Sequence, residues 1–413
     1  MALARELMTR TNAPSGRWWK LSGVWFLYLA FGLTMASLAP LVAEIESDLQ
    51  FSHAAMGSIL GAWQFVYIFA AIPCGLLLDR LGGKWGIFLG GVFIGLSGLM
   101  RGWADSYAML LLAVGLFGLG GPLISAGAPK IVSEHFVGSQ RGLAMGIYIT
   151  GPGIGAMAAL LLTQPVLLPL LNGDWQRLLQ FWGLVSLAAA VFWLFVARRD
   201  SSSPRVAKGA LATLEGLQDL LDSSAVRLIL LMSVGVFAIN HGMGNWLVEI
   251  IKSQGESAER ASLLASIPVA VGILSALGLP RLATGNRRFG VLAILFGCSV
   301  IASLILLSHP RPALLVAALI FEGIAAGSMM TVLILTLVET PGVGQKRAGT
   351  ASGFFFAAAE IGGVGGPVML GGLLAINGNF DASLMALALV GSLLLVSVRP
   401  LRRLVTANPV ASE

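Results

Sequence analysis

The sequence predicts an all-α membrane protein with twelve transmembrane helices in two six-helix bundles and both termini in the cytoplasm. Three observations support this fold class. The 413 residues are 56% hydrophobic and only 11% charged, whereas soluble domains carry about 25% charged residues. Twelve apolar runs are long enough, or nearly so, to cross the hydrocarbon layer as helices. Basic residues are unequally divided between successive connections, as in proteins that span a membrane.

The apolar runs follow one another along the whole chain. The first comes after a basic N-terminal segment and is too long for the core of a cleaved signal peptide, so we expect it to remain as the first span. The third and the twelfth are the shortest. The runs cover residues 21–43, 53–78, 85–100, 107–129, 142–165, 178–197, 228–249, 261–280, 289–308, 313–338, 349–372 and 382–398.

Lysine and arginine set the expected orientation. Of the 26 basic residues, 21 fall in the termini and the even-numbered connections, and 5 fall in the odd-numbered ones. Cytoplasmic loops accumulate positive charge, so we expect both termini in the cytoplasm and the chain in the inner (plasma) membrane. The net charge of +6 therefore reflects contact with the lipid bilayer, and no nucleic-acid partner is predicted.

The longest connection divides the spans into two sets of six. Residues 198–227 open with two arginines, an aspartate and three serines, a composition typical of a soluble linker. We therefore expect an N-terminal six-helix bundle at 1–197, a cytoplasmic linker at 198–227 and a C-terminal six-helix bundle at 228–413.

An internal repeat relates the fifth span to the eleventh. Small residues four positions apart in both spans let helix backbones approach closely. Two related halves are typical of carriers, which expose a site near the bilayer midplane alternately to either side. A shift of 207 residues aligns Gly142, Ala144, Gly146, Ile154 and Gly155 with Gly349, Ala351, Gly353, Ile361 and Gly362.

The connection between the second and third spans carries a five-position motif, formed by Gly75, Asp79, Arg80, Gly82 and Lys84. The glycines permit a tight turn, and the acidic side chain can pair with nearby basic groups and helix ends to hold the cytoplasmic side closed. The motif resembles the signature of the major facilitator superfamily. That resemblance implies the major facilitator fold, transport by alternating access and a gate at this loop. The second-half copy, at residues 280–288, keeps its basic residues but has no aspartate.

Two further segments resemble branches of this superfamily. Residues 129–130 and 141–148 are similar to the cyanate and nitrate/nitrite porters, which implies a small organic or inorganic anion as substrate. Nitrate porters hold their anion with arginines in the second and eighth spans, and here those spans have none. Gly151-Pro152-Gly153 resembles part of the motif of drug antiporters, which implies efflux. Both substrate classes stay open.

Two carboxyl groups lie near the centres of predicted spans. Glu322 is near the centre of the tenth span and Glu360 near the centre of the eleventh. Ionisable groups at membrane depth are costly and are functional candidates by default. Hydrocarbon favours the neutral form of a carboxyl group, which is what a proton-coupling site needs. The resemblance places spans one, four, seven and ten around the cavity, which favours Glu322. The alternative is a protonated glutamate that only links helices.

The seventh span is interrupted by polar residues, Asn240, His241 and Asn245. They indicate a path for a solute, with Tyr28 in the first span and Gln64 in the second as further hydrogen-bonding groups. His241 could exchange protons near neutral pH, although a membrane histidine is more often a helix-to-helix hydrogen-bond partner. Lys130, at the inner end of the fourth span, is a candidate ligand for an anion, or else it pairs with Glu134 one turn later.

No enzyme, cofactor or metal site is predicted. Cys74 and Cys298 lie in apolar runs, so neither a disulfide framework nor a metal cluster is available. Neither a phosphate loop nor a nucleophile with its base can be identified. We therefore predict a monomeric, proton-coupled secondary transporter of a small solute. Export by proton antiport is the alternative, facilitated diffusion shares the architecture, and a transporter-like receptor or scaffold is the third class.

Overall fold

The computed structural model describes residues 14–137, 139–198, 221–341 and 343–406, and in this part every regular element is a helix. Eleven helical segments are long and apolar enough to cross a membrane, as expected for an all-α membrane protein. The main helices are α2 (Pro14–Ala36), α4 (His53–Arg101), α5 (Tyr107–His135), α6 (Ser139–Leu162), α8 (Trp175–Val196), α10 (Ser224–Ser253), α11 (Ala258–Gly278), α12 (Arg287–Leu307), α13 (Pro312–Val338), α14 (Gly344–Asn377) and α15 (Asp381–Thr406).

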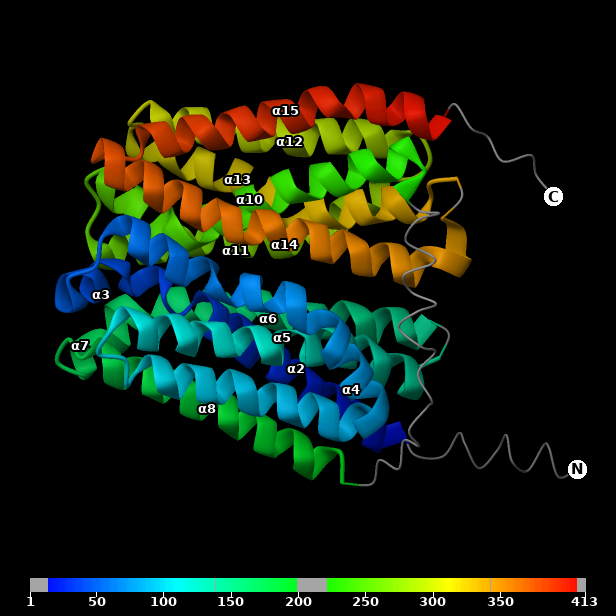
Figure 1. Cartoon of the computed structure of the whole chain (residues 1–413), viewed down its shortest axis with the longest axis horizontal. Coiled ribbons are helices and arrows are strands. Elements are labelled where there is room, and N and C mark those ends of the chain that lie inside the picture. The colour runs from blue at the N-terminus through cyan, green and yellow to red at the C-terminus, as the bar shows by residue number, and fades with distance from the viewer. Residues whose placement is uncertain (1–13, 138, 199–220, 342, 407–413) are drawn as a thin grey trace, which may run out of the picture.

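One of these helices covers two of the predicted apolar runs. Helix α4 has 49 residues, about twice the length that one crossing needs. Its backbone leaves helical geometry at Gly82, where φ is 75° and ψ is 167°, a conformation that suits glycine. Leu78 lies against Gly86 across this break, so the chain reverses direction there. In Figure 1 the two arms of α4 meet at this reversal, and α5 lies between them. One helix therefore covers two of the twelve predicted runs, which leaves eleven segments.

The first predicted run is not one continuous helix. After α2 the chain forms the short 3-10 helix η1 (Ala39–Leu41) and then α3 (Val42–Leu49). The fully buried guanidinium of Arg101 donates to the carbonyl oxygen of Thr34 at 2.6 Å and to Ser37 Oγ at 3.2 Å. Carbonyl groups at a helix end have no partner within the helix, so Arg101 stabilises the break that ends α2.

The helices of the two sequence halves occupy different parts of the molecule. In Figure 1, α2 to α8 lie in the lower part and α10 to α15 in the upper part. The first turn of α2 and the last turn of α15 lie at the same end. Most of the expected linker, residues 199–220, lies outside the described residues, and α10 begins at Ser224.

The internal repeat corresponds to equivalent helix contacts. Helix α6 packs against α2, and α14 packs against α10. Gly155 of α6 lies against the backbone of Leu29, and Gly362, its equivalent under the 207-residue shift, lies against the backbone of Val234. A Cβ atom at either glycine would collide with that backbone, so the contact requires glycine.

Three other glycines of the repeat do not make the close contacts that their spacing predicted. No atom lies within 4 Å of the position that a Cβ would take at Gly142, Gly146 or Gly353. These residues lie in the first halves of α6 and α14, so the glycine contacts with neighbouring backbone that the repeat makes at Gly155 and Gly362 lie in the second half of each helix.

The two sets of helices meet at the end opposite the first turn of α2 (Figure 1). Gly57 of α4 faces the backbone of Pro367, and Gly61 faces Val364, both on α14. The hydroxyl of Ser262 on α11 donates to the carbonyl oxygen of Leu160 on α6 at 2.6 Å. Small residues thus allow α4 and α14 to approach closely.

Candidate functional site

Glu360 lies where the two sets of helices meet. It is only 4% exposed, and its Oε2 has no hydrogen-bond partner. The position that a Cβ of Gly363 would take lies 2.5 Å from this Oε2, 3.1 Å from Gln64 Cγ and 3.4 Å from His241 Cδ2. Three polar side chains, from α14, α4 and α10, therefore converge on one point.

His241 and Gln64 are joined across the same contact. Gln64 Nε2 donates to His241 Nδ1 at 3.3 Å, so the imidazole accepts at Nδ1 and carries its hydrogen at Nε2. The rings of Trp63 and Phe237 flank it, each with its centroid 5.4 Å away. This is a helix-to-helix hydrogen bond, the alternative to proton exchange that the sequence left open for His241. The Oε1 of Gln64 is buried without a partner.

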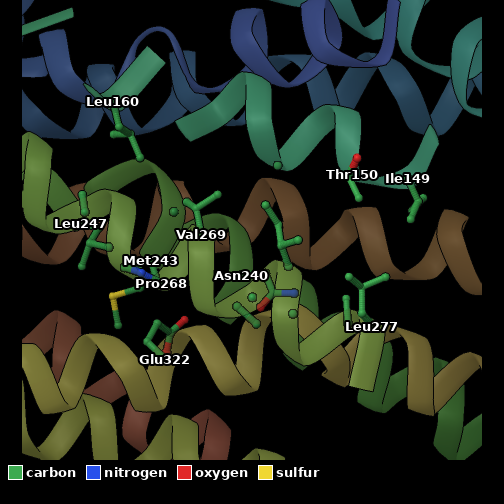
Figure 2. Close-up of a pocket in the computed structure, with 18 residues that line it drawn as sticks. Ile149, Thr150, Leu160, Asn240, Met243, Leu247, Pro268, Val269, Leu277 and Glu322 are labelled. Carbon is green, nitrogen blue, oxygen red and sulfur yellow. The ribbon is translucent and has the colours of Figure 1, made fainter. Parts of the chain in front are cut away.

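A cavity of about 310 Å³ lies between α6 and the helices α10, α11 and α13, and Figure 2 shows its wall. Three of its lining residues have polar side chains, Thr150, Asn240 and Glu322. The Thr150 hydroxyl accepts from Trp25 Nε1 at 3.1 Å and donates to the Ile147 carbonyl oxygen at 2.7 Å. Its hydrogen-bonding capacity is therefore largely used, unlike that of the other two.

Glu322 and Asn240 each present an unsatisfied oxygen. Glu322 is 2% exposed, and its Oε2 has no partner; the Oδ1 of Asn240 also has none. Figure 2 shows both side chains in the wall of the cavity, on α13 and α10. Buried polar atoms without a partner are rare in proteins, so these two acceptors mark a place where a ligand or a proton can bind.

Lys130 pairs with a residue that the sequence did not predict, since the two interpretations were an anion ligand and a pair with Glu134. Its Nζ lies 2.9 Å from Asp79 Oδ1, and it does not line the cavity. The pair joins α5 to the first arm of α4 just before the break. In this structure Lys130 therefore belongs with the Gly75 to Lys84 loop, because Asp79 and not Glu134 is its partner.

The other positions of that loop have separate environments. Gly82 forms the break with a positive φ, whereas no atom lies within 4 Å of a Cβ position at Gly75. Arg80 is exposed. The ammonium of Lys84 lies 5.3 Å from the ring centroid of Trp85, and its carbonyl oxygen accepts from Trp193 Nε1 at 2.8 Å.

Two of the predicted pathway residues have partners within their own set of helices. Asn245 Nδ2 donates to the carbonyl oxygen of His241 at 2.8 Å. The Tyr28 hydroxyl donates to the carbonyl oxygen of Ser125 at 3.4 Å, and its ring makes an edge contact with Tyr148 at 5.2 Å. Neither Asn245 nor Tyr28 lines the cavity.

The apolar wall of the cavity was not predicted from the sequence. Helix α11 contributes several residues to the wall, Pro268, Val269 and Gly272 among them. None of the residues that α11 contributes has a polar side chain. Apolar and small residues of this kind look the same in sequence whether they line a cavity or pack against a neighbouring helix.

This chain is similar to known membrane transporters. A family model described as Major Facilitator Superfamily matches residues 24–367. "Probable galactarate/D-glucarate transporter GudP" of Bacillus subtilis (strain 168) is 25% identical, with 95% of each chain covered. "Probable nitrate transporter NarT" of Staphylococcus epidermidis (strain ATCC 35984) is 25% identical, with 87% of this chain and 90% of the relative covered.

The fold is also that of a solved transporter. The crystal structure of a mutant of the nucleoside transporter NupG has a TM-score of 0.77 at 16% identity and covers 93% of this chain and 99% of that chain. Together with the long apolar helices, these matches identify a multi-pass integral membrane protein, in bacteria of the inner membrane, whose activity is transport and not catalysis.

Proposed function

Because the chain belongs to the major facilitator superfamily, we propose that it is a secondary active transporter, which moves a small solute by alternating access and is driven by protons. One observation carries the proposal: Glu360 has an unpartnered carboxyl oxygen, buried at the contact between the two sets of helices. A proton that binds there acts on the contact that alternating access must open.

The surroundings of Glu360 favour this coupling. The groups that converge with it are the Gln64 amide and the His241 imidazole, neither of which supplies a positive charge in this hydrogen-bond arrangement. A buried carboxylate without a cation costs free energy, whereas a protonated carboxyl group does not carry that cost. Protonation of Glu360 therefore stabilises the contact between α4 and α14, and loss of the proton favours its separation.

Membership of the superfamily also supports a proposal for how the chain crosses the membrane. We propose twelve crossings, two of them in α4, with bundles at 1–197 and 228–413 joined by the linker at 198–227 and both termini in the cytoplasm. The 21 to 5 division of basic residues supports this orientation. The contacts of Gly57 and Gly61 with α14 then lie toward the outside. A monomer suffices for this mechanism.

Transport in reconstituted vesicles tests the proposal. The purified protein is placed in liposomes with an imposed pH gradient and offered labelled organic anions, cyanate-like ions and cationic drugs, while a dye reports internal pH. We expect one class to move against its concentration gradient with a matching change in internal pH, and a protonophore to abolish both. Movement that ignores the gradient would identify facilitated diffusion and contradict the proton coupling.

The ion pair between Asp79 and Lys130 gives a second test. We expect Asp79→Asn to lower the transport rate up to about fivefold, because it removes the ion pair between α4 and α5, and a partly exposed ion pair contributes up to about 1 kcal/mol. The exchange of both charges, Asp79→Lys with Lys130→Asp, is expected to restore most of the rate in the same vesicle assay. Glu134→Gln is the control, since Glu134 is exposed and is not the partner of Lys130. A loss of rate in that variant would favour Glu134 as the functional partner.

A further inference from the structure

We infer that the cavity beside Glu322 binds an organic amine with a mainly apolar body, and not the anions that the names of the relatives mention. The inference rests on the proposed function, since it takes this cavity as the site of the transported solute. It is carried by the composition of the cavity wall and by the two unsatisfied acceptors, Glu322 Oε2 and Asn240 Oδ1.

The wall of the cavity selects for apolar surface. Met243, Leu247, Val269 and Ile273 are among its lining residues, and the volume of about 310 Å³ lies at the lower end of the range of small-molecule sites, roughly 300 to 1,000 Å³. A sugar acid such as glucarate carries a hydroxyl group on each inner carbon. Most of those groups would be buried here without a partner, which is unfavourable.

The charge of the wall selects against anions. None of the residues that line the cavity in the described part of the chain is basic, and Glu322 is the acidic one. Nitrate and carboxylates offer only hydrogen-bond acceptors, so they cannot satisfy the oxygens of Glu322 and Asn240. A protonated amine supplies both N–H donors and a positive charge, and its hydrogen bond to a carboxylate is of the strong, charge-assisted type.

Two basic side chains within the helices, Lys130 and Arg101, could bind an anion, but neither lines the cavity. Lys130 is paired with Asp79 at 2.9 Å, and Arg101 donates to the carbonyl oxygen of Thr34 at the end of α2. An anion in the cavity would therefore lie beside an acidic residue with no cation lining the same space.

Equilibrium binding to the purified protein in detergent tests this inference without any gradient. The probes share one apolar body: 1-naphthylmethylamine, the matching alcohol 1-naphthalenemethanol and the matching carboxylate 1-naphthoate, with glucarate and nitrate added. By isothermal titration we expect the amine to bind most tightly, the alcohol more weakly and the three anions not at all.

Variants locate the binding. Glu322→Gln is expected to weaken binding of the amine about tenfold or more, because it removes the charge-assisted hydrogen bond, and to leave binding of the alcohol unchanged. Glu259→Gln, an exposed carboxylate at the start of α11, is the matched control and should change neither. Gly244→Leu should abolish binding of both probes, because Gly244 lines the cavity and has no atom within 4 Å of its Cβ position. Should Gly244→Leu not fold, the comparison of Glu322→Gln with Glu259→Gln decides alone.

The possible results separate the two proposals. Anion binding as tight as amine binding, or amine binding that is unchanged in Glu322→Gln, would overturn the inference. Gradient-driven transport of glucarate or nitrate without amine binding would also overturn it, while leaving the proton-coupled carrier in place. Amine binding that depends on Glu322, in a protein whose transport ignores the pH gradient, would support the inference and contradict the proposed coupling.

Discussion

Replacement of Glu360 by glutamine is expected to abolish gradient-driven accumulation while exchange of solute across the membrane stays measurable. Glutamine has nearly the same size and can still bond to neighbouring groups, but it cannot gain or lose a proton. With one proton per solute, a gradient of about two pH units supports up to about 100-fold accumulation, because each unit corresponds to about 1.4 kcal/mol. The variant should instead equilibrate its solute, as seen in paired accumulation and counterflow assays with labelled substrate.

Two comparisons make this result specific. Glu259→Gln removes an exposed carboxylate at the start of α11 and should accumulate solute like the unmodified protein. Accumulation that persists in Glu360→Gln would show that Glu360 only links helices, the alternative that its position in the sequence left open. Loss of exchange together with accumulation would point to a defect in the contact between α4 and α14.

The residues that carry this prediction could be identified from the sequence, but their relation could not. Glu322 and Glu360 stand out because carboxyl groups are rare within apolar spans. Their neighbours could not be identified in the same way. Glu360 lies beside Gln64 and His241 because α4 packs against α10 and α14, two helices that are distant from α4 in the sequence. Family resemblance favoured Glu322 because of the span that it occupies, whereas the structure places Glu322 in the cavity wall and Glu360 at the contact between the two sets of helices.

Local reasoning also failed where a distant partner was available. Glu134 is one turn from Lys130 and was the natural partner by helical spacing, yet Asp79 is the partner in the structure. The apolar run that begins at residue 21 gave no sign of the break after Ala36, because hydropathy does not record that Arg101 bonds to the carbonyl group of Thr34. By contrast, the turn expected from the loop motif is present at Gly82, where the sequence itself supplies the backbone freedom.

Alanine at Gly155 or at Gly362 is expected to lower the thermal stability of the purified protein, whereas alanine at Gly146 or Gly353 is not. At the first two positions a Cβ would collide with backbone of α2 or α10, and overpacking of this kind costs about 1–3 kcal/mol. At the other two no atom lies within 4 Å. Alanine there gains helix propensity, up to about 1 kcal/mol in a helix interior, so the two pairs should shift the melting temperature in opposite directions.

The difference between these two pairs of glycines indicates which helix contacts persist while the carrier changes conformation. The contacts of Gly155 and Gly362 join helices within one set of the repeat, so they can persist while the two sets move relative to each other. Gly146 and Gly353 have open space beside them, where a closing movement can bring in a neighbour. Tryptophan fluorescence during thermal unfolding of the four variants measures the difference. Equal destabilisation of all four would mean that the glycines act through the backbone alone, and that the repeat does not divide permanent contacts from transient ones.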